Sequence, residues 1–436
     1  MGYGKITKQL VEFANKSSHF DVIDEFTSFL QDYIVLNKQN NIEAYTFPFE
    51  AVPYNIERII AIDSGETVVE LNDYPSAKLY VVKFGIVELA LKDILELSKV
   101  YPICPQHLSS ITKTITTSCF IPSSNIKHKN HRSISKSIRY AMYKYYLDTG
   151  LASTLKYILY KEYESPSMPK TLSTHPTMPD KHNILINASD FDEHYKTIIE
   201  GEEVYITDMF RLHEIITEEL GFSVEALHQF TLVTEHLMML SLIRDMYETD
   251  KDLLSKTLFI LDRPLSFYGQ VSNLQRQVRD YFNFLHSQGV SFYLVGVEKS
   301  GAFVEHARLL KKKGLLPPSS FMLLDSDYIQ SYIVPRSNQK GLYGAATYYG
   351  AKLFFHTASG KLYVCSFPTS SADVLQAPQP SDYPHLHEIL SVLELLESNA
   401  YQDALLPIIL ANDTVAISQN PGNISLQYHA SKILNK

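Results

Sequence analysis

Two short apolar runs that each end on an aspartate constrain the fold of this chain more than any other feature. Residues 258–261 lead directly into Asp262, and Pro264 then stops regular structure. Residues 59–62 lead in the same way into Asp63. A continuous apolar run is typical of a central strand that is covered on both faces, and the ligands of such sheets gather at strand ends. If the two strands are neighbours, their carboxylates come together.

The order of the predicted elements indicates a mixed sheet. The Asp63 run and two further β-rich runs, residues 67–71 and 77–91, are joined by short turns, which predicts three antiparallel strands. Later, the Asp262 strand is followed by a helix over residues 271–288 and a strand over residues 290–297, which predicts parallel pairing through a right-handed crossover. We therefore predict an α/β fold with a ribonuclease H-like mixed five-stranded sheet, flanking helices and a large helical insertion. Its first and fourth strands are neighbours.

This interpretation divides the chain into four regions: an N-terminal helical region (1–54), a first part of the core with strands one to three (55–98), a helical and loop insertion (99–200), and a second part of the core with a C-terminal helical region (201–436). Residues 101–124 are predicted to be irregular, and the proline-rich residues 165–180 are predicted to be a loop. A long helix over residues 224–247, with Ser223 at its start, leads into the Asp262 strand.

Composition narrows the class of protein. A chain of 436 residues with 45% hydrophobic content can bury a large core. Its formal net charge of −9 gives no global signature of a nucleic-acid binder. The three cysteines form no CxxC pair, which favours a reducing compartment, and no stretch approaches the ~20 apolar residues of a membrane span. We expect a cytoplasmic protein that does not enter a membrane.

Two local basic stretches are candidates for contact with DNA. Their residues are Lys127, Lys129 and Arg132, before a tyrosine-rich helix, and Lys311, Lys312 and Lys313, at the end of a helix over residues 302–313. Contact with a phosphate backbone is one interpretation. The other is a solvated helix start for the first stretch and cations that complement a helix C-terminus for the second.

Paired acids at strand ends point to metal chemistry. Clustered carboxylates repel one another unless divalent cations lie between them, and Mg²⁺ or Mn²⁺ prefers hard oxygen ligands. Two such ions can activate a water and stabilise the leaving oxygen in phosphodiester cleavage, which makes nuclease the natural activity. A nucleotide-binding protein has no support, because no GxxxxGK[ST] or GxGxxG motif follows a strand.

Several segments, taken in order, resemble the NurA nucleases, which work with the hexameric HerA ATPase in DNA end processing. The resemblance covers residues 55–420 and rests on Ala61-Ile62-Asp63-Ser64-Gly65, Leu261-Asp262-Arg263-Pro264-Leu265, Gly296-Val297-Glu298-Lys299-Ser300, Tyr343-Gly344 and Leu410-Ala411-Asn412-Asp413. One departure lies in the second of these segments. The family usually has a glycine after the aspartate, and Arg263 stands there in this chain.

The resemblance implies a set of site residues. The implied catalytic residues are Asp63, Glu235, Asp262 and Lys299, and the implied ligands of two Mn²⁺ or Mg²⁺ ions are Asp63, Glu235, Asp262 and Asp413. Glu235 is preferred because it lies on the long helix before the Asp262 strand, with Glu248 as the alternative. The family's late metal position falls on Asn412, so Asp413 is expected to act in its place.

The resemblance also implies a function and partners. We expect a divalent-metal-dependent deoxyribonuclease that acts in DNA end processing, in DNA repair or in antiviral defence against phage. It would be at least a homodimer and would dock on a HerA-like hexameric ATPase. The alternative is a catalytically weak or inactive NurA-like scaffold that binds and regulates such an ATPase, which the departures at Arg263 and Asn412 favour.

Overall fold

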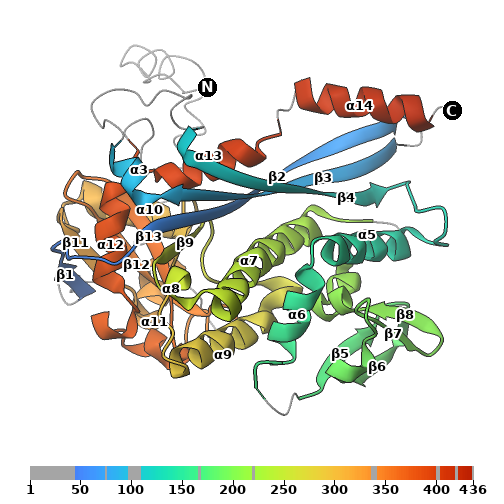
Figure 1. The fold of residues 1–436 in the computed structure, drawn as a ribbon, viewed down its shortest axis with the longest axis horizontal. Helices are drawn as coiled ribbons and strands as arrows, with labels where there is room; N and C mark the ends of the chain where they lie inside the picture. Colours follow the sequence, from blue (N-terminus) through green and yellow to red (C-terminus); the bar gives the residue numbers. More distant parts are fainter. Residues whose placement is uncertain are drawn as a thin grey trace, which may run out of the picture. The chain divides into compact units, whose positions relative to one another are not determined.

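A large mixed sheet lies at the centre of the computed structural model (Figure 1). The structure describes residues 45–73, 76–96, 110–164, 168–218, 221–334, 341–398, 403–417 and 421–434. From one edge to the other, the strands of the sheet are β1 (Thr46–Pro48), β11 (Ser320–Leu323), β12 (Gly350–His356), β13 (Leu362–Pro368), β10 (Tyr293–Glu298), β9 (Thr257–Leu261), β2 (Arg58–Asp73), β3 (Ser76–Ala90) and β4 (Thr112–Ser124). The helices predicted before residue 45 lie outside the described residues.

The two acid-bearing strands are neighbours, as the sequence predicts. β2 and β9 are parallel, and their register pairs Ile59 with Leu258 and Ile62 with Leu261. β10 is parallel to β9, whereas β3 and β4 continue the sheet beyond β2 in antiparallel fashion. The two halves of the core, which are far apart in the sequence, therefore meet at the junction of β2 and β9.

The predicted count of five strands is wrong, because the sheet has nine strands among the described residues. β13 pairs antiparallel with β10, and the sheet continues through β12 and β11 to β1. The apolar runs within residues 343–355 and 361–367 are typical of strands, but a local pattern does not reveal which strand edge will accept them. The free edge of β10 accepts β13.

Two further segments differ from the sequence prediction. The runs at residues 58–65 and 67–71 form the single strand β2. Residues 112–124, predicted to be irregular, form the edge strand β4, which is separated from β2 by β3. The segment is rich in β-branched threonine, which favours strands, and its alternation is weak because an edge strand is largely exposed. The predicted loop at residues 165–180 contains most of a hairpin, β5 (Lys170–His175) and β6 (Met178–Ile186).

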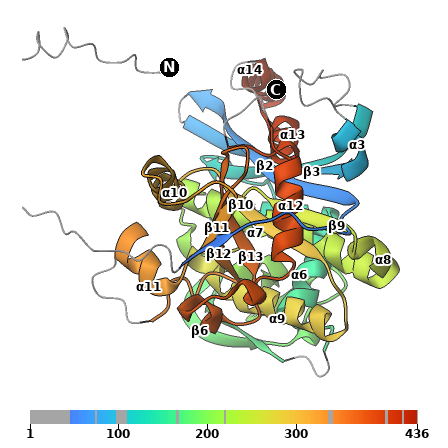
Figure 2. The same cartoon turned by 90° about the vertical axis from the view of Figure 1, so that its left-hand side faces the viewer.

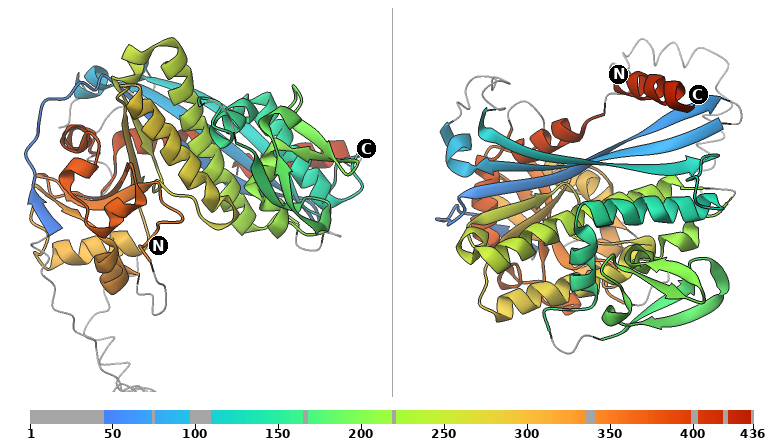
Figure 3. Two further views of the ribbon diagram at one scale, coloured as in Figure 1. Left: turned by 90° about the horizontal axis from the view of Figure 1, so that it is seen from below. Right: turned by 45° about the vertical axis from the view of Figure 1, so that its right-hand side comes forward.

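Helices cover both faces of the sheet (Figures 1 and 3). The two sides of β2 show the division, since Ile60 and Ile62 pack into one core and Ile59 and Ala61 into the other. The first core includes residues of α5 (Ile134–Asp148), α6 (Leu151–Leu159), α7 (Val224–Thr249) and α9 (Leu274–Ser287). The second includes residues of α12 (Leu386–Leu395) and α13 (Leu406–Val415), which Figure 2 shows in front of the strands.

The remaining elements are short or peripheral: α3 (Leu91–Glu96), α8 (Lys251–Leu254), α10 (Ala302–Lys312), α11 (Ser326–Tyr328), α14 (Pro421–Leu434) and the hairpin of β7 (Lys196–Ile199) and β8 (Glu202–Tyr205). The long helix α7 begins as predicted, because the Ser223 hydroxyl accepts a hydrogen bond of 3.1 Å from the Ala226 backbone N–H. The described residues from Tyr45 onward form one compact unit. No helix in the described ranges is long and apolar enough to span a membrane.

The end of α13 lies directly on β2 and β3, at two glycines. A Cβ atom on Gly65 would lie 2.4 Å from the carbonyl oxygen of Val415, and one on Gly85 would lie 2.6 Å from a Val415 methyl carbon. Lys83 fixes the same helix end, because its Nζ donates a hydrogen bond of 2.7 Å to the Thr414 carbonyl. The glycine of the Asp63-Ser64-Gly65 segment therefore allows close backbone approach two residues after the aspartate.

We expect Gly65→Ala to lower the free energy of unfolding by about 1–3 kcal/mol, because the new methyl group meets a backbone oxygen that moves only with the helix. Gly85→Ala is the matched control and should cost less, since it meets a side-chain methyl group. Urea unfolding followed by circular dichroism measures both. Equal losses for the two variants would contradict this account of the α13 contact.

Candidate active site

Asp63 and Asp262 lie side by side where β9 ends and β2 continues. The parallel register pairs Ile62 with Leu261, so the next residue of each chain segment is one of the two aspartates. Side chains alternate along a strand, so both carboxylates belong to the face of the sheet covered by α12 and α13. Neighbouring strands are about 4.8 Å apart. The fold thus brings together two acids that are far apart in the sequence.

Both carboxyl groups have raised pKa values. Burial, then the charges of Asp262 and Glu235, raise the pKa of Asp63 to about 7. Burial raises the pKa of Asp262 to about 6, although the neighbouring Lys299 acts in the opposite direction. Asp63 Oδ1 accepts a hydrogen bond of 2.8 Å from the Ser64 backbone N–H, whereas Oδ2 is buried without a hydrogen-bond partner among the described residues. A cation beside this oxygen would relieve the unfavourable charge.

Lys299 stands beside the pair. It follows β10, which is parallel to β9, and its Nζ lies 2.5 Å from Asp262 Oδ2. Its side chain is 37% exposed, so the ammonium group is accessible from solvent. The lysine that the sequence pattern singled out therefore neutralises one of the two aspartates.

Glu235 approaches from the opposite face of the sheet, on α7. Its side chain is fully buried, and the Arg263 guanidinium donates two hydrogen bonds to its carboxylate. Nε donates to Oε2, and Nη2 donates to Oε1 over 3.1 Å. Ser64 Oγ donates a further hydrogen bond of 2.5 Å to Oε1. Arg263 Nη2 also lies 3.3 Å from Thr231 Oγ1, one turn earlier on α7. Both oxygens of this carboxylate are thus occupied by side chains of the protein.

The other predicted acids are not brought to this place. Glu248 lies at the end of α7, 46% exposed, and pairs with Arg244 at 2.9 Å. On α13, Ala411 faces the sheet core, so the next residues, Asn412 and Asp413, turn away from it and are exposed. No hydrogen bond or ion pair within the described ranges joins Asp413 to the aspartate pair, so its metal role stays a prediction.

The residues beside the aspartate pair limit the oxygen donors that a divalent ion could use. No group of three or more His, Cys, Asp or Glu side chains in the described part of the chain is arranged to hold a metal ion. The reason is geometric, because Glu235 lies across the sheet and is held by Arg263. Asp63, with its unpartnered buried Oδ2, and Asp262 remain as two carboxylates whose hard oxygens suit Mg²⁺ or Mn²⁺.

Sequence reasoning missed Arg263 and Ser64 as functional neighbours of Glu235. A signal existed for Arg263, because it stands where the resembled family has glycine. A second signal was Glu235 itself, a charged residue within an apolar stretch of helix, which requires a buried cation as partner.

The first basic stretch lies far from the aspartate pair. Its three predicted DNA contacts are exposed and follow the end of β4: Lys127, Lys129 and Arg132. β4 passes the level of Asp63 at Thr116 and ends at Ser124. At about 3.3 Å per residue, the strand end is about 26 Å beyond that level. These cations could contact only a distant part of a nucleic acid.

The second basic stretch is partly used by the fold. Lys311 Nζ donates a hydrogen bond to the Gly360 carbonyl in the turn between β12 and β13. Lys312 and Lys313 are exposed at the end of α10. Lys311 is therefore a structural contact, and the other two lysines remain available to solvent.

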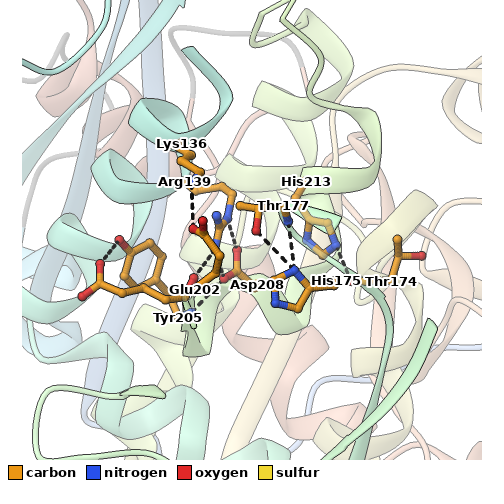
Figure 4. Close-up of polar contacts among 10 residues, drawn as sticks. Lys136, Arg139, Thr174, His175, Thr177, Glu202, Tyr205, Asp208 and His213 are labelled. Atoms are coloured by element: carbon orange, nitrogen blue, oxygen red, sulfur yellow. Dashed lines mark hydrogen bonds and ion pairs between the residues drawn. The ribbon is translucent and has the colours of Figure 1, made fainter. Parts of the chain in front are cut away.

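The basic residues that follow the first stretch are also used internally, in a polar cluster shown in Figure 4. Arg139 is buried on α5 and donates two hydrogen bonds to the Asp208 carboxylate. Nε donates to Oδ1 over 2.8 Å, and Nη2 donates to Oδ2 over 2.7 Å. Lys136, one turn earlier, pairs with Glu202 of β8 at 2.7 Å. His213 Nε2 lies 2.9 Å from the Thr174 carbonyl of β5. The cluster ties α5 to the two small hairpins.

The chain is similar over nearly its whole length to several solved structures of NurA. With the NurA nuclease from Sulfolobus solfataricus it shares 10% identity over 98% of each chain, with a TM-score of 0.34. A second NurA structure has 12% identity, covers 99% of this chain and 98% of its own, and has a TM-score of 0.32. A NurA structure with manganese has 13% identity, covers 97% of this chain and 98% of its own, and has a TM-score of 0.30. No protein-family model and no curated protein matches the chain.

The polar cluster predicts how much each of its two ion pairs stabilises the fold. Arg139→Met should lower the free energy of unfolding by about 3–5 kcal/mol, because it leaves the Asp208 carboxylate buried without its partner. Lys136→Met is the matched control, on the same helix but with a partly exposed pair, and should cost less than about 1 kcal/mol. Chemical denaturation measures both. A small loss for Arg139→Met would show that the buried pair does not stabilise the insertion.

Proposed function

We propose that this chain is a divalent-metal-dependent deoxyribonuclease of the NurA type, which hydrolyses phosphodiester bonds in DNA. One observation carries the proposal, the aspartate pair that β2 and β9 place side by side with one buried oxygen unpartnered. The strand order β4-β3-β2-β9-β10, with β2, β9 and β10 parallel, supports a ribonuclease H-like core within the larger sheet. The sequence segments that resemble NurA supply the substrate class.

The residues of the chain have separate roles in this proposal. Asp63 and Asp262 would hold the metal, and Mn²⁺ or Mg²⁺ at this place would supply water activation and stabilise the leaving oxygen. Lys299 is partly exposed beside Asp262, so its ammonium group can neutralise the oxygens of the scissile phosphate. The strand ends fix all three side chains on one rigid sheet, which keeps the reacting groups in place.

The proposed partners rest on the resemblance to NurA, and the charge of the chain bears only on how DNA reaches the site. A net charge of −9 makes unaided affinity for DNA weak. We propose that a HerA-like hexameric ATPase delivers the substrate to a homodimer of this chain, in DNA end processing or in defence against phage in the cytoplasm. The exposed cations Lys127, Lys129, Arg132, Lys312 and Lys313 would add local contacts to the phosphate backbone.

A second candidate function is a catalytically weak or inactive NurA-like scaffold that binds and regulates the ATPase. The observation that favours it is the pair of Arg263 and Glu235, because a carboxylate gripped by a guanidinium is withdrawn from metal binding. The accessible Lys299 and the unpartnered oxygen of Asp63 favour the nuclease.

The nuclease proposal predicts which substitutions abolish activity. Degradation of labelled DNA with Mn²⁺ or Mg²⁺, with and without the ATPase, should be lost in Asp63→Asn and in Asp262→Asn, which keep shape but remove a charged ligand. Lys299→Ala should slow cleavage by about a hundredfold to a thousandfold without abolishing metal binding. Asp252→Asn, at an exposed aspartate on α8, is the control and should be fully active.

Full activity in either aspartate variant at the active site would sink the proposed mechanism. A wild-type chain that cleaves no DNA even with its ATPase would favour the scaffold instead.

The proposed assembly predicts a molar mass in solution that is at least twice that of one chain. Light scattering at micromolar concentration should give a dimer or larger, and the chain should elute together with the hexameric ATPase in gel filtration. A monomer that elutes apart from the ATPase would refute the assembly without affecting the cleavage assay.

A further inference from the structure

Three acidic side chains lie near the end of β9, and two of them already have a cation of the protein as partner. Lys299 neutralises Asp262, and Arg263 neutralises Glu235. Of the three acids, only Asp63 has a buried oxygen without a hydrogen-bond partner among the described residues. One unbalanced negative charge is enough to attract one divalent ion, but it does not compensate two.

The pair of Arg263 and Glu235 is fixed rather than adjustable. Glu235 is fully buried, and the two-nitrogen grip of Arg263 is the strongest geometry for a guanidinium and a carboxylate. Ser64 donates to the same carboxylate from β2. If Glu235 turned toward a metal on the other face of the sheet, it would leave the largely buried guanidinium without its partner, which is strongly unfavourable.

The backbone of Arg263 is also held in place. A Cβ atom on Gly296 would lie 2.3 Å from the Arg263 carbonyl oxygen, so the chain after β9 is pressed against β10. That Cβ atom would also lie 2.6 Å from Ser366 Oγ, which accepts a hydrogen bond of 2.9 Å from the Leu265 N–H. The side chain of Arg263 reaches Glu235 and Thr231 of α7, and 26% of it is exposed.

We propose that Arg263 takes the place of a second divalent ion, so that the site binds a single ion at Asp63 and Asp262. Glu235 is then a positioning residue that holds Arg263, and it is not a metal ligand. The inference rests on the proposed nuclease function for its meaning, but it concerns metal binding alone. It replaces the two-ion site with Glu235 as ligand that the family resemblance implied.

A built-in guanidinium differs from a metal ion in one measurable way. Arginine stays charged at every accessible pH, so its contribution does not depend on the metal concentration. Only one ion then has to bind before the site is complete. Activity should rise with Mn²⁺ concentration along a curve with a Hill coefficient of about 1, because a single binding event is required.

Isothermal titration of the full chain with Mn²⁺, after removal of metal with a chelator, tests the proposal directly. The wild-type chain should bind one ion. Arg263→Ala should bind two, because it removes the cation that pairs with Glu235 and leaves only the Ser64 hydroxyl on this carboxylate. Arg263→Lys keeps a cation there and should bind one. Arg244→Ala is the matched control on the same side of the sheet, where an arginine also pairs with a glutamate of α7, and it should bind one ion.

Glu235→Gln covers the case in which Arg263→Ala fails to fold. This variant removes the charge but keeps the shape, and it should still bind one ion with an affinity within about threefold of wild type. Loss of the ion in Glu235→Gln would show that Glu235 is a ligand and would overturn the proposal. Two ions or none in the wild-type chain, or one ion in folded Arg263→Ala, would overturn it as well.

The outcomes separate this inference from the proposed function. One bound ion in a chain that cleaves no DNA would refute the nuclease and leave the single-ion site standing. Two bound ions in a chain that cleaves DNA would do the reverse.

Discussion

Everything at the candidate site depends on the parallel pairing of β2 with β9. This pairing joins segments about two hundred residues apart in the sequence, and it sets Asp63 next to Asp262 at the end of β9. Two buried carboxylates at this distance repel each other, and burial alone already disfavours their charged forms. The fold tolerates them because lysine and arginine side chains stand on the two faces of the sheet beside them.

The polar side chains on the two faces of the sheet differ in how far their hydrogen bonds are satisfied. On the face of α12 and α13, the aspartate pair and Lys299 keep a partly exposed ammonium group and one unpartnered oxygen, which is the arrangement of a binding site. On the face of α7, Glu235 and Arg263 form a closed pair that Ser64 completes. α13 is kept close to the first face by Gly65 and Gly85, which leave no side chain in the way of its last turn.

The sequence predicted the elements with strong local patterns and missed those that depend on distant partners. β9, β10 and α7 were predicted because their apolar runs and the Ser223 cap are local signals, and the adjacency of β2 and β9 followed from their order. β4 was missed because its threonine-rich sequence is half exposed at an edge. The four extra strands were missed as part of the sheet because pairing with β10 is decided by tertiary contacts. Among the acids, periodicity placed Glu235 on a helix, but it did not show which side chain would meet it.

Anomalous diffraction from crystals grown with Mn²⁺ would test the central claim most directly. The account predicts one anomalous peak per chain, about 2.1 Å from carboxylate oxygens of both Asp63 and Asp262, with Glu235 still held by Arg263. Two peaks with Glu235 as a ligand, or no peak at the aspartate pair, would contradict it.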